Sequence, residues 1–308
     1  DQIALGTANT TVTAANLSGT GEGIIVANAD GTLTRIAYNS TDLANIGSGG
    51  SASTCNANGT NATCLGDEAQ ANGNVSVALG YSANASSDGS IALGSNASAT
   101  SSKSIAIGQN SVASGSQSIA LGSEVNASGT YATAVGGLSN ASGYRSTAIG
   151  SLTNAGDYAT AVGDRSNASG IESTAVGVLA KASGRSSTAV GFRSTAPGNY
   201  SQAFGHMATA SNSVSLAIGY NSTASGANSI AIGPCSSASG INSQAVGLWA
   251  NASGSKAQAI GHRACAQAHR SQAIGAYSIA NAENSLAIGS GAKAFANQST
   301  ALGFEAKA

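Results

Sequence analysis

The chain has 308 residues, of which 41 are Gly and only 8% are charged, and its formal net charge is −1. This charge excludes both the basic surface of a nucleic-acid-binding protein and an acidic tail. Ala, Ser, Gly, Asn and Thr are abundant and aromatic residues are few, which is typical of a linker unless the residues recur with a fixed period. No apolar run approaches the roughly 20 residues of a membrane-spanning helix.

The N-terminal segment, residues 1–63, interrupts a repeat that dominates the rest of the chain. An early copy of the repeat tripeptide, Ala4-Leu5-Gly6, is cut off by an insertion at residues 7–62. We expect residues 1–63 to form a partial rung with an inserted hairpin and loop that cap the exposed end of the repeat, because solenoid ends need covers. A dedicated binding tip is the alternative. The predicted hairpin has strands at residues 23–28 and 33–38 and a turn at Asp30-Gly31.

Residues 64–308 repeat the tripeptide Ala-apolar-Gly every 14 residues. The first full copy is Ala78-Leu79-Gly80, the last is Ala301-Leu302-Gly303, and Gly66 adds one copy with Cys64 in the place of Ala. When each rung is numbered from its Gly as position 0, Ala occupies position 5 and nearly always position 12, Ser favours position 10, and position 13 is apolar. The pattern Ser-x-Ala-apolar-Gly alternates with period two, which is typical of a strand.

The period predicts an all-β solenoid of about 18 parallel rungs. Fourteen residues accommodate two short strands and two turns. Rungs stacked at about 4.8 Å would form a rod of roughly 85 Å. A single step, from Gly150 to Gly163, is one residue short, and we place the missing residue in the turn between Ala155 and Gly156.

The alternation also assigns two faces to each strand. We expect the apolar residue of position 13 to point into the roll with position 11 beside it, opposite the alanine of position 5. Positions 10, 12 and 0 would then present Ser, Ala and Gly outward, which indicates a close-packed contact with another chain. The inverted assignment is the alternative. The predicted contact alanines are Ala92, Ala106, Ala120, Ala134 and Ala148.

The rung Ser104-Ile105-Ala106-Ile107-Gly108, repeated in register over about four fifths of the chain, resembles the head repeat of YadA-type trimeric autotransporter adhesins. The resemblance implies a left-handed parallel β-roll, a homotrimer, and display on the bacterial cell surface in a virulence-associated adhesin. The stalk and outer-membrane anchor of that family are absent from this sequence, so we expect a segment of a longer protein.

The four cysteines divide into two pairs. Cys55 and Cys64 bracket eight residues, and the oxidising cell exterior favours a disulfide between them. Cys235 and Cys265 lie two rungs apart at positions 2 and 4, about 12 Å from each other, whereas a disulfide requires Cα atoms within about 7 Å. We expect no bond between them within one chain, while a contact between chains stays open.

The sequence offers no catalytic constellation, because its carboxylates are scattered and no nucleophile–base pair stands out. His262, Cys265 and His269 share a rung but differ in phase. We therefore expect neither an enzyme nor a metal site, and no cofactor.

Bulky side chains concentrate at positions 2 and 9. Exposed aromatic residues and Arg are the residue types of binding hot spots, although decoration of a rigid rod is the alternative. The candidate binding residues are Trp249, Arg193, Arg263, Arg165, Met207, Tyr200 and Leu179.

Together these features predict adhesion through multivalent contacts with host matrix proteins, host cells or abiotic surfaces, and no nucleic-acid partner. An ice-binding or purely structural solenoid is the alternative class, because threonines recur at position 11 in five successive rungs. The residues two places further on are Val or Ile rather than a second threonine column. The threonines are Thr133, Thr147, Thr160, Thr174 and Thr188.

Overall fold

The computed structural model describes residues 23–27, 33–37 and 55–308, and the chain divides into two units, Asp1–Ala52 and Ser53–Ala308. In the first unit, strands β1 (Gly23–Ala27) and β2 (Leu33–Ala37) pair antiparallel. The two strands of the predicted hairpin are therefore confirmed. Asp30-Gly31 and Ala4-Leu5-Gly6 lie outside the described residues, and the capping role of residues 1–63 stays a prediction.

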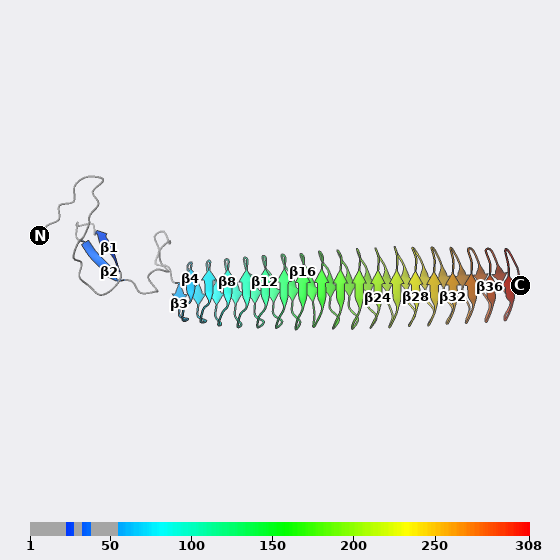
Figure 1. Ribbon diagram of the computed structural model, residues 1–308, viewed down its shortest axis with the longest axis horizontal. Helices are drawn as coiled ribbons and strands as arrows, with labels where there is room; N and C mark the ends of the chain where they lie inside the picture. Colours follow the sequence, from blue (N-terminus) through cyan, green and yellow to red (C-terminus); the bar gives the residue numbers. More distant parts are fainter. Residues whose placement is uncertain (1–22, 28–32, 38–54) are drawn as a thin grey trace, which may run out of the picture. The chain divides into compact units, whose positions relative to one another are not determined.

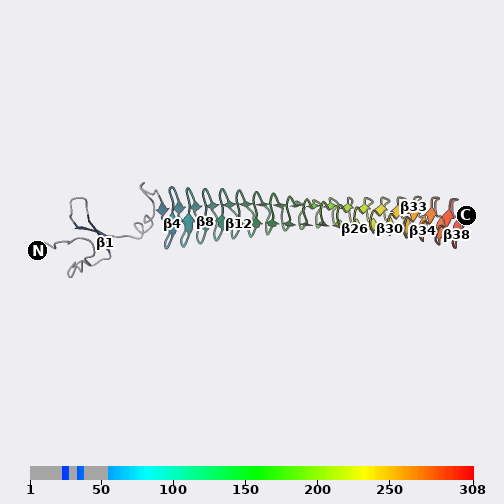
Figure 2. The same cartoon turned by 90° about the horizontal axis from the view of Figure 1, so that it is seen from above.

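The second unit is a rod of parallel rungs, each of which contributes one strand to each of two sheets (Figure 1). The strands at positions 11–13 have even numbers and form one sheet, here called the even sheet. The strands at positions 4–5 have odd numbers and form the other sheet, the odd sheet. Figure 2 shows the two rows of strands along the rod. The predicted all-β solenoid is confirmed, and the described residues contain no helix long and apolar enough to cross a membrane.

The strands of the even sheet are β4 (Thr63–Leu65), β6 (Val77–Leu79), β8 (Ile91–Leu93), β10 (Ile105–Ile107), β12 (Ile119–Leu121), β14 (Thr133–Val135), β16 (Thr147–Ile149), β18 (Thr160–Val162), β20 (Thr174–Val176), β22 (Thr188–Val190), β24 (Gln202–Phe204), β26 (Leu216–Ile218), β28 (Ile230–Ile232), β30 (Gln244–Val246), β32 (Gln258–Ile260), β34 (Gln272–Ile274), β36 (Leu286–Ile288) and β38 (Thr300–Leu302). The strands of the odd sheet are β3 (Asn56–Ala57), β5 (Gln70–Ala71), β7 (Asn84–Ala85), β9 (Ser98–Ala99), β11 (Val112–Ala113), β13 (Asn126–Ala127), β15 (Asn140–Ala141), β17 (Asn154–Ala155), β19 (Asn167–Ala168), β21 (Lys181–Ala182), β23 (Thr195–Ala196), β25 (Thr209–Ala210), β27 (Thr223–Ala224), β29 (Ser237–Ala238), β31 (Asn251–Ala252), β33 (Cys265–Ala266), β35 (Ile279–Ala280) and β37 (Lys293–Ala294).

The rungs stack in register, so that each residue lies beside its equivalent in the next rung. In the even sheet Ile105 pairs with Ile91 on one side and Ile119 on the other. Backbone groups of one rung bond to the next, as when the Ile105 amide donates to the Ser118 carbonyl at 2.9 Å. Within the strands, this pairing satisfies backbone groups through the neighbouring rungs.

The short rung keeps this register in both sheets. Thr147 pairs with Thr160 in the even sheet, and Asn154 pairs with Asn167 in the odd sheet. The Gly156 amide donates directly to the Ala168 carbonyl at 2.9 Å. The missing residue therefore lies in the turn after Ala155, as predicted.

The interior of the roll contains only small side chains, from positions 3, 5, 10 and 12. At position 5 Ala127 is fully buried, as expected. At position 3 Val125 is the largest fully buried side chain among the described residues. The two sheets face each other across a layer of Ala and Ser and lie too close together to hold Ile or Leu between them. Each strand therefore turns its small residues inward and its large apolar residues outward.

The predicted assignment of faces was therefore wrong, and the inverted alternative is correct. The alanines of position 12 point into the roll and are fully buried within a single chain, so their side chains cannot contact another chain. The apolar residues of positions 11 and 13 point outward instead, as Ile107 shows with 37% of its surface exposed. The alanines predicted as contacts and found inside are Ala92, Ala106, Ala120, Ala134 and Ala148.

The turns depend on glycine and on buried hydroxyl groups. At position 0, Gly80 has φ +132°, and a Cβ there would lie 2.6 Å from the Gly94 carbonyl oxygen of the next rung. At position 10, the buried Ser146 hydroxyl donates to the Gly143 carbonyl at 2.8 Å and closes the opposite turn. Stacked rungs thus leave no room for a side chain at position 0.

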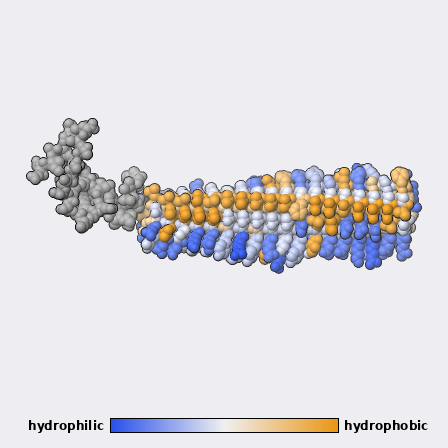
Figure 3. Space-filling model, viewed as in Figure 1, coloured by the Kyte–Doolittle hydropathy of each residue, from blue (hydrophilic) through white to orange (hydrophobic). Residues whose placement is uncertain are grey.

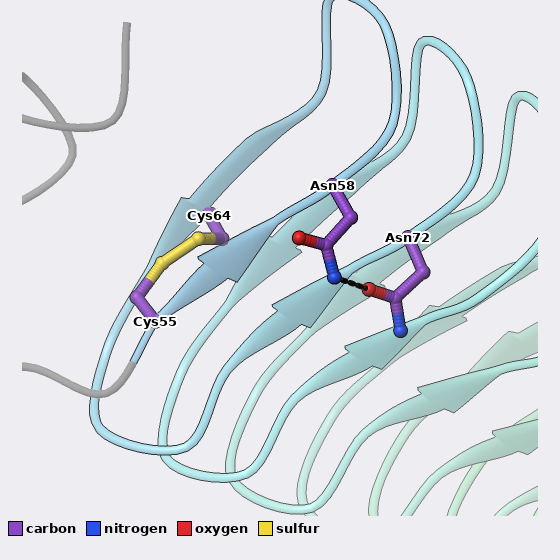
Figure 4. Close-up of a disulfide and its surroundings, with 4 residues drawn as sticks. All are labelled: Cys55, Asn58, Cys64 and Asn72. Carbon is purple, nitrogen blue, oxygen red and sulfur yellow. Dashed lines mark hydrogen bonds between the residues drawn. A yellow bond between two sulfur atoms is a disulfide. The ribbon is translucent and has the colours of Figure 1, made fainter. Parts of the chain in front are cut away.

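The first rung is closed by a disulfide between Cys55 and Cys64, as predicted (Figure 4). Cys55 occupies position 3 of a rung that precedes Gly66, and Cys64 occupies position 12. Both sulfurs therefore stand where the interior otherwise holds small side chains, and they join the odd sheet to the even sheet. The pairing of β3 with β5 places the start of the roll before residue 64. Beside the disulfide, Asn58 donates to Asn72 at 2.8 Å.

Candidate binding surfaces

Two edges of the roll carry large side chains on a left-handed backbone. We call positions 1 and 2 the first edge and positions 8 and 9 the second edge. Every non-glycine residue at positions 2 and 9 among the described rungs has a φ between 50° and 61°. This conformation costs most residues roughly 1–2 kcal/mol relative to Gly, and Asn tolerates it better. The strain makes these positions candidates for function, because neither the interior nor the hydrogen-bond ladder requires a bulky side chain there.

The predicted binding residues divide between the two edges. Trp249 is 54% exposed on the first edge, and Tyr200 is exposed on the second edge, across the roll. The structure therefore does not bring the seven residues into one site; it distributes them along the rod. The residues on the first edge are Arg165, Leu179, Arg193, Met207, Trp249 and Arg263.

Position 1 adds aromatic rings to the first edge that sequence reasoning missed. Phe192, His206 and Tyr220 form a continuous stack, with ring centroids 5.0 and 5.2 Å apart and planes within 12° of parallel. The guanidinium of Arg193 lies 5.2 Å from the centre of the Phe192 ring. The available signal was an aromatic residue directly after Gly in three successive rungs.

The second edge carries a separate aromatic cluster. Tyr144 meets Tyr131 and Tyr158 edge-to-face, with ring centroids 5.9 and 5.2 Å away. Arg145 lies over the rings of Tyr131 and Tyr144 at 5.6 and 5.3 Å. Such contacts hold large side chains in place before a partner arrives, which lowers the entropy lost on binding.

The outer face of the even sheet is an apolar stripe, formed by the side chains of positions 11 and 13. Figure 3 shows it running along the roll. Position 13 is apolar in every rung, and position 11 is apolar in some runs of rungs and Thr or Gln in others. The threonine column of the ice-binding alternative, including Thr133 and Thr147, forms part of this stripe.

The outer face of the odd sheet is polar in its central rungs. The side-chain amides of Asn126, Asn140, Asn154 and Asn167 form a ladder, with successive donor–acceptor distances of 3.0, 3.0 and 3.4 Å. Lys181 and Thr195 continue the same column. The two sheets thus present opposite chemistry, one apolar and one polar.

The remaining cysteines and the histidines stay apart. Cys235 and Cys265 form no disulfide within the chain, as predicted. Burial raises the pKa of the Cys265 thiol, and a hydrogen bond with the Gln267 side chain opposes that rise. His262 at position 1 and His269 at position 8 belong to opposite edges. Across residues 55–308 no three metal-ligating side chains come together.

Comparison with known proteins identifies the repeat. The model of the YadA head domain repeat matches almost the whole roll. A matching solved structure is the collagen-binding domain of the Yersinia adhesin YadA, at 23% sequence identity and a TM-score of 0.18. That alignment covers 56% of this chain and 66% of the Yersinia chain, just under two thirds of its length. No curated protein matches this sequence. The matched residues are 57–80, 76–97, 99–124, 127–153, 155–180, 182–206, 215–234, 238–264, 266–292 and 280–306.

The matched segments run through the same rungs that the 14-residue period defines. Since these segments cover well over half of the sequence, the chain belongs to the family of YadA head domain repeats.

Proposed function

We propose that this chain is the adhesive head of a trimeric surface protein, which attaches bacteria to host matrix proteins, host cells or abiotic surfaces. The observation that carries the proposal is the pair of edges with bulky residues in a strained backbone conformation, on a roll of YadA head repeats. In this proposal the protein is displayed outside the cell and is held to the outer membrane through other regions of the full-length protein. Its role is binding rather than catalysis.

The apolar stripe supports assembly into a homotrimer. Its column at position 13 is apolar in every rung and runs for about 85 Å along the roll. A long exposed apolar surface rimmed by polar residues is typical of a protein–protein interface. A second and a third copy of the same roll match its length and its rung spacing. Three stripes that meet on a common axis would leave both edges and the odd sheet open to a ligand.

The same assembly argues against the ice-binding alternative. An ice-binding solenoid needs a flat, exposed array of threonines, and Thr133, Thr147 and their equivalents lie in the stripe that the trimer would cover. The neighbouring column of side chains, at position 13, consists of Val and Ile beside these threonines, as in the pairing of Val135 with Ile149.

Binding in this proposal is spread over many rungs. The candidate residues lie along both edges, and each copy in a trimer repeats them. Many weak contacts that act together give an avidity gain on the order of 10²–10⁴ over a single contact. A partner surface with repeated features, such as a fibrous matrix protein, would benefit most.

The test is the adhesion of cells that display the head at matched surface levels to a panel of surfaces that includes collagen, cultured host cells and plastic. The triple variant Arg193→Ser, Trp249→Ser and Arg263→Ser should weaken attachment more than deletion of two complete rungs, residues 95–122, which keeps the register. If a single substitution abolishes attachment while assembly is intact, binding occurs at one discrete site and the distributed proposal is wrong.

A further inference from the structure

The outer face of the last rungs contains a groove of about 540 Å³ between the first edge and the odd sheet. Position 2 carries Tyr277 in one rung and Glu305 two rungs later, and Gly291 stands between them. Because Gly291 has no side chain, the first edge is interrupted there and the groove opens. It lies on the opposite sheet from the apolar stripe, so a trimer packed through the stripe leaves it accessible.

The groove is basic. Three cationic side chains line it, Arg263, Lys293 and Lys307, against a single carboxylate, that of Glu305. Lys293 and Lys307 occupy position 4 of adjacent rungs and form a parallel bridge through their backbones. Two like charges on neighbouring rungs repel each other and destabilise the sheet slightly, and an anion between them would relieve that repulsion.

The end of the roll that contains the groove is basic as a whole. Residues 240–308 contain five Lys or Arg and two Asp or Glu, which gives a net charge of +3. Residues 55–239 contain six Lys or Arg and seven Asp or Glu, which gives a net charge of −1. A local excess of positive charge on a near-neutral protein concentrates anionic ligands at that end of the roll. The five cations are Lys256, Arg263, Arg270, Lys293 and Lys307, and the two carboxylates are Glu283 and Glu305.

The groove also has an aromatic wall and an apolar floor. Tyr277 is about half exposed, and the guanidinium of Arg263 lies 5.7 Å from its ring centre. Ile279 lies at position 4 between Cys265 and Lys293. An aromatic face beside cationic groups suits a sugar ring that bears acidic substituents, because the ring stacks while the substituents pair with the cations.

We propose that this groove binds a linear acidic polysaccharide. Its sulfate or carboxylate groups pair with Lys293 and Lys307, and one sugar ring lies against Tyr277. The carboxylate of Glu305 accepts hydrogen bonds from the hydroxyls of the sugar rings. A nucleic acid strand would need several aromatic side chains for its bases, and the groove has one.

The inference deepens the proposed function, on which it rests for its biological setting, but its test uses the purified chain of residues 1–308 and needs no adhesion. Fluorescence anisotropy would measure the affinity for a labelled sulfated hexasaccharide, its desulfated form that keeps the carboxylates, a neutral hexasaccharide and a single-stranded oligonucleotide. We expect binding to the sulfated form, weaker binding to the carboxylated form, and none to the neutral form. The affinity should fall with added salt, because exposed charges are screened.

Two variants locate the site. The double variant Lys293→Gln, Lys307→Gln should lose roughly five- to tenfold in affinity, the loss of two partly exposed charge pairs. Gly291→Leu should fill the groove without removing charge and should lose at least as much. Leucine is tolerated at position 2, as Leu138 and Leu152 show with φ of 59° and 54°.

The matched control is Lys103→Gln, Lys181→Gln, which removes the same charge from exposed residues far from the groove, and it should bind like the unchanged protein. Circular dichroism would verify that every variant keeps the fold. Equal losses in the control and in the groove variants, or equally tight binding of the oligonucleotide, would mean non-specific polyanion binding and overturn the proposal. If the chain binds neither of the two acidic hexasaccharides, the proposal is also wrong. In that case adhesion of displaying cells to protein surfaces would still support the proposed function.

Discussion

Two kinds of residue determine this roll, the small ones inside and the bulky ones at its edges. Inside, the alanines of positions 5 and 12 have no accessible surface between the terminal rungs, and Ser at position 10 adds a hydrogen bond at little volume. At the edges, positions 2 and 9 take a left-handed backbone conformation in every described rung. The interior therefore excludes large residues by volume, whereas the edges accept them at an energetic cost.

Replacing Ala120 with Leu should destabilise the fold of each roll, beyond any effect on assembly. Three extra carbon atoms have no space between the two sheets, and overpacking of this kind typically costs about 1–3 kcal/mol. We expect a lower melting temperature by circular dichroism. The control Ile119→Leu, on the outer face of the same strand, should change it little. If Ala120→Leu abolished assembly without lowering the melting temperature, the alanines of position 12 would have to point outward after all.

Val214 offers the opposite test at an edge. It is β-branched, exposed and held at φ 56°, a conformation that a β-branched residue strongly disfavours. Val214→Asn should stabilise the roll by about 1 kcal/mol, and the reverse change one rung later, Asn228→Val, should destabilise it similarly. The measurement is the shift of each thermal transition. An unchanged or lower melting temperature for Val214→Asn would contradict the strain argument.

At the scale of the element, each rung is complete only when another rung lies beside it. A strand of two or three residues is too short to be stable alone, so its stability comes from the ladder on both sides. The first described rung has a roll neighbour on one side, through the pairing of β3 with β5. The disulfide between Cys55 and Cys64 joins the two strands of this rung and stabilises it covalently.

The double variant Cys55→Ser, Cys64→Ser should loosen this end and leave the centre unchanged. Closing a short loop typically contributes about 2–4 kcal/mol. Hydrogen exchange should accelerate at the amides of Asn56 and Thr63, which donate at 2.8 and 2.9 Å to Ala69 and Ser76. The Ile105 amide is the internal control. Thiol titration of the denatured, unreduced native chain should find two free thiols, and finding four would contradict the disulfide.

At the scale of the whole molecule, the roll is asymmetric in chemistry between its two outer faces. The even sheet presents the apolar stripe, and the odd sheet presents polar side chains that include the ladder from Asn126 to Asn167. Sedimentation equilibrium should give three times 29.4 kDa for the native chain. A monomer at micromolar concentration would contradict the trimer.

Ile107→Asp combined with Leu121→Asp should dissociate the proposed trimer, because each carboxylate would be buried against apolar neighbours at a cost of several kcal/mol. The same two changes should leave the strand content of the separated chains intact, since both side chains point away from the interior. Asn126→Asp, on the odd sheet, is the matched control and should sediment like the native chain.

The sequence predicts the repeat, the parallel strands, the hairpin strands and the disulfide, because each depends on spacing. It does not predict which face of a strand is inside. Ala and Ile are both apolar, so alternation alone assigns them equally well to either face. The decisive signal is volume: Ala and Ser recur at positions 10 and 12 of one strand and at positions 3 and 5 of the facing segment, and four small residues can close a thin interior together. The groove beside Gly291 depends on a missing side chain, which no motif reports.

The hydrogen bonds between rungs run along the axis of the roll, and this gives the roll an unusual mechanical response. A force that pulls the ends of one chain apart loads the bonds at the outermost rung alone, so rungs detach one after another. Each detached rung releases 14 residues, which extend to roughly 46–50 Å in place of a rise of about 4.8 Å. Single-molecule stretching should therefore show a staircase of nearly equal steps of roughly 40–45 Å. A head built in this way lengthens in stages under load and absorbs work before its attachment fails.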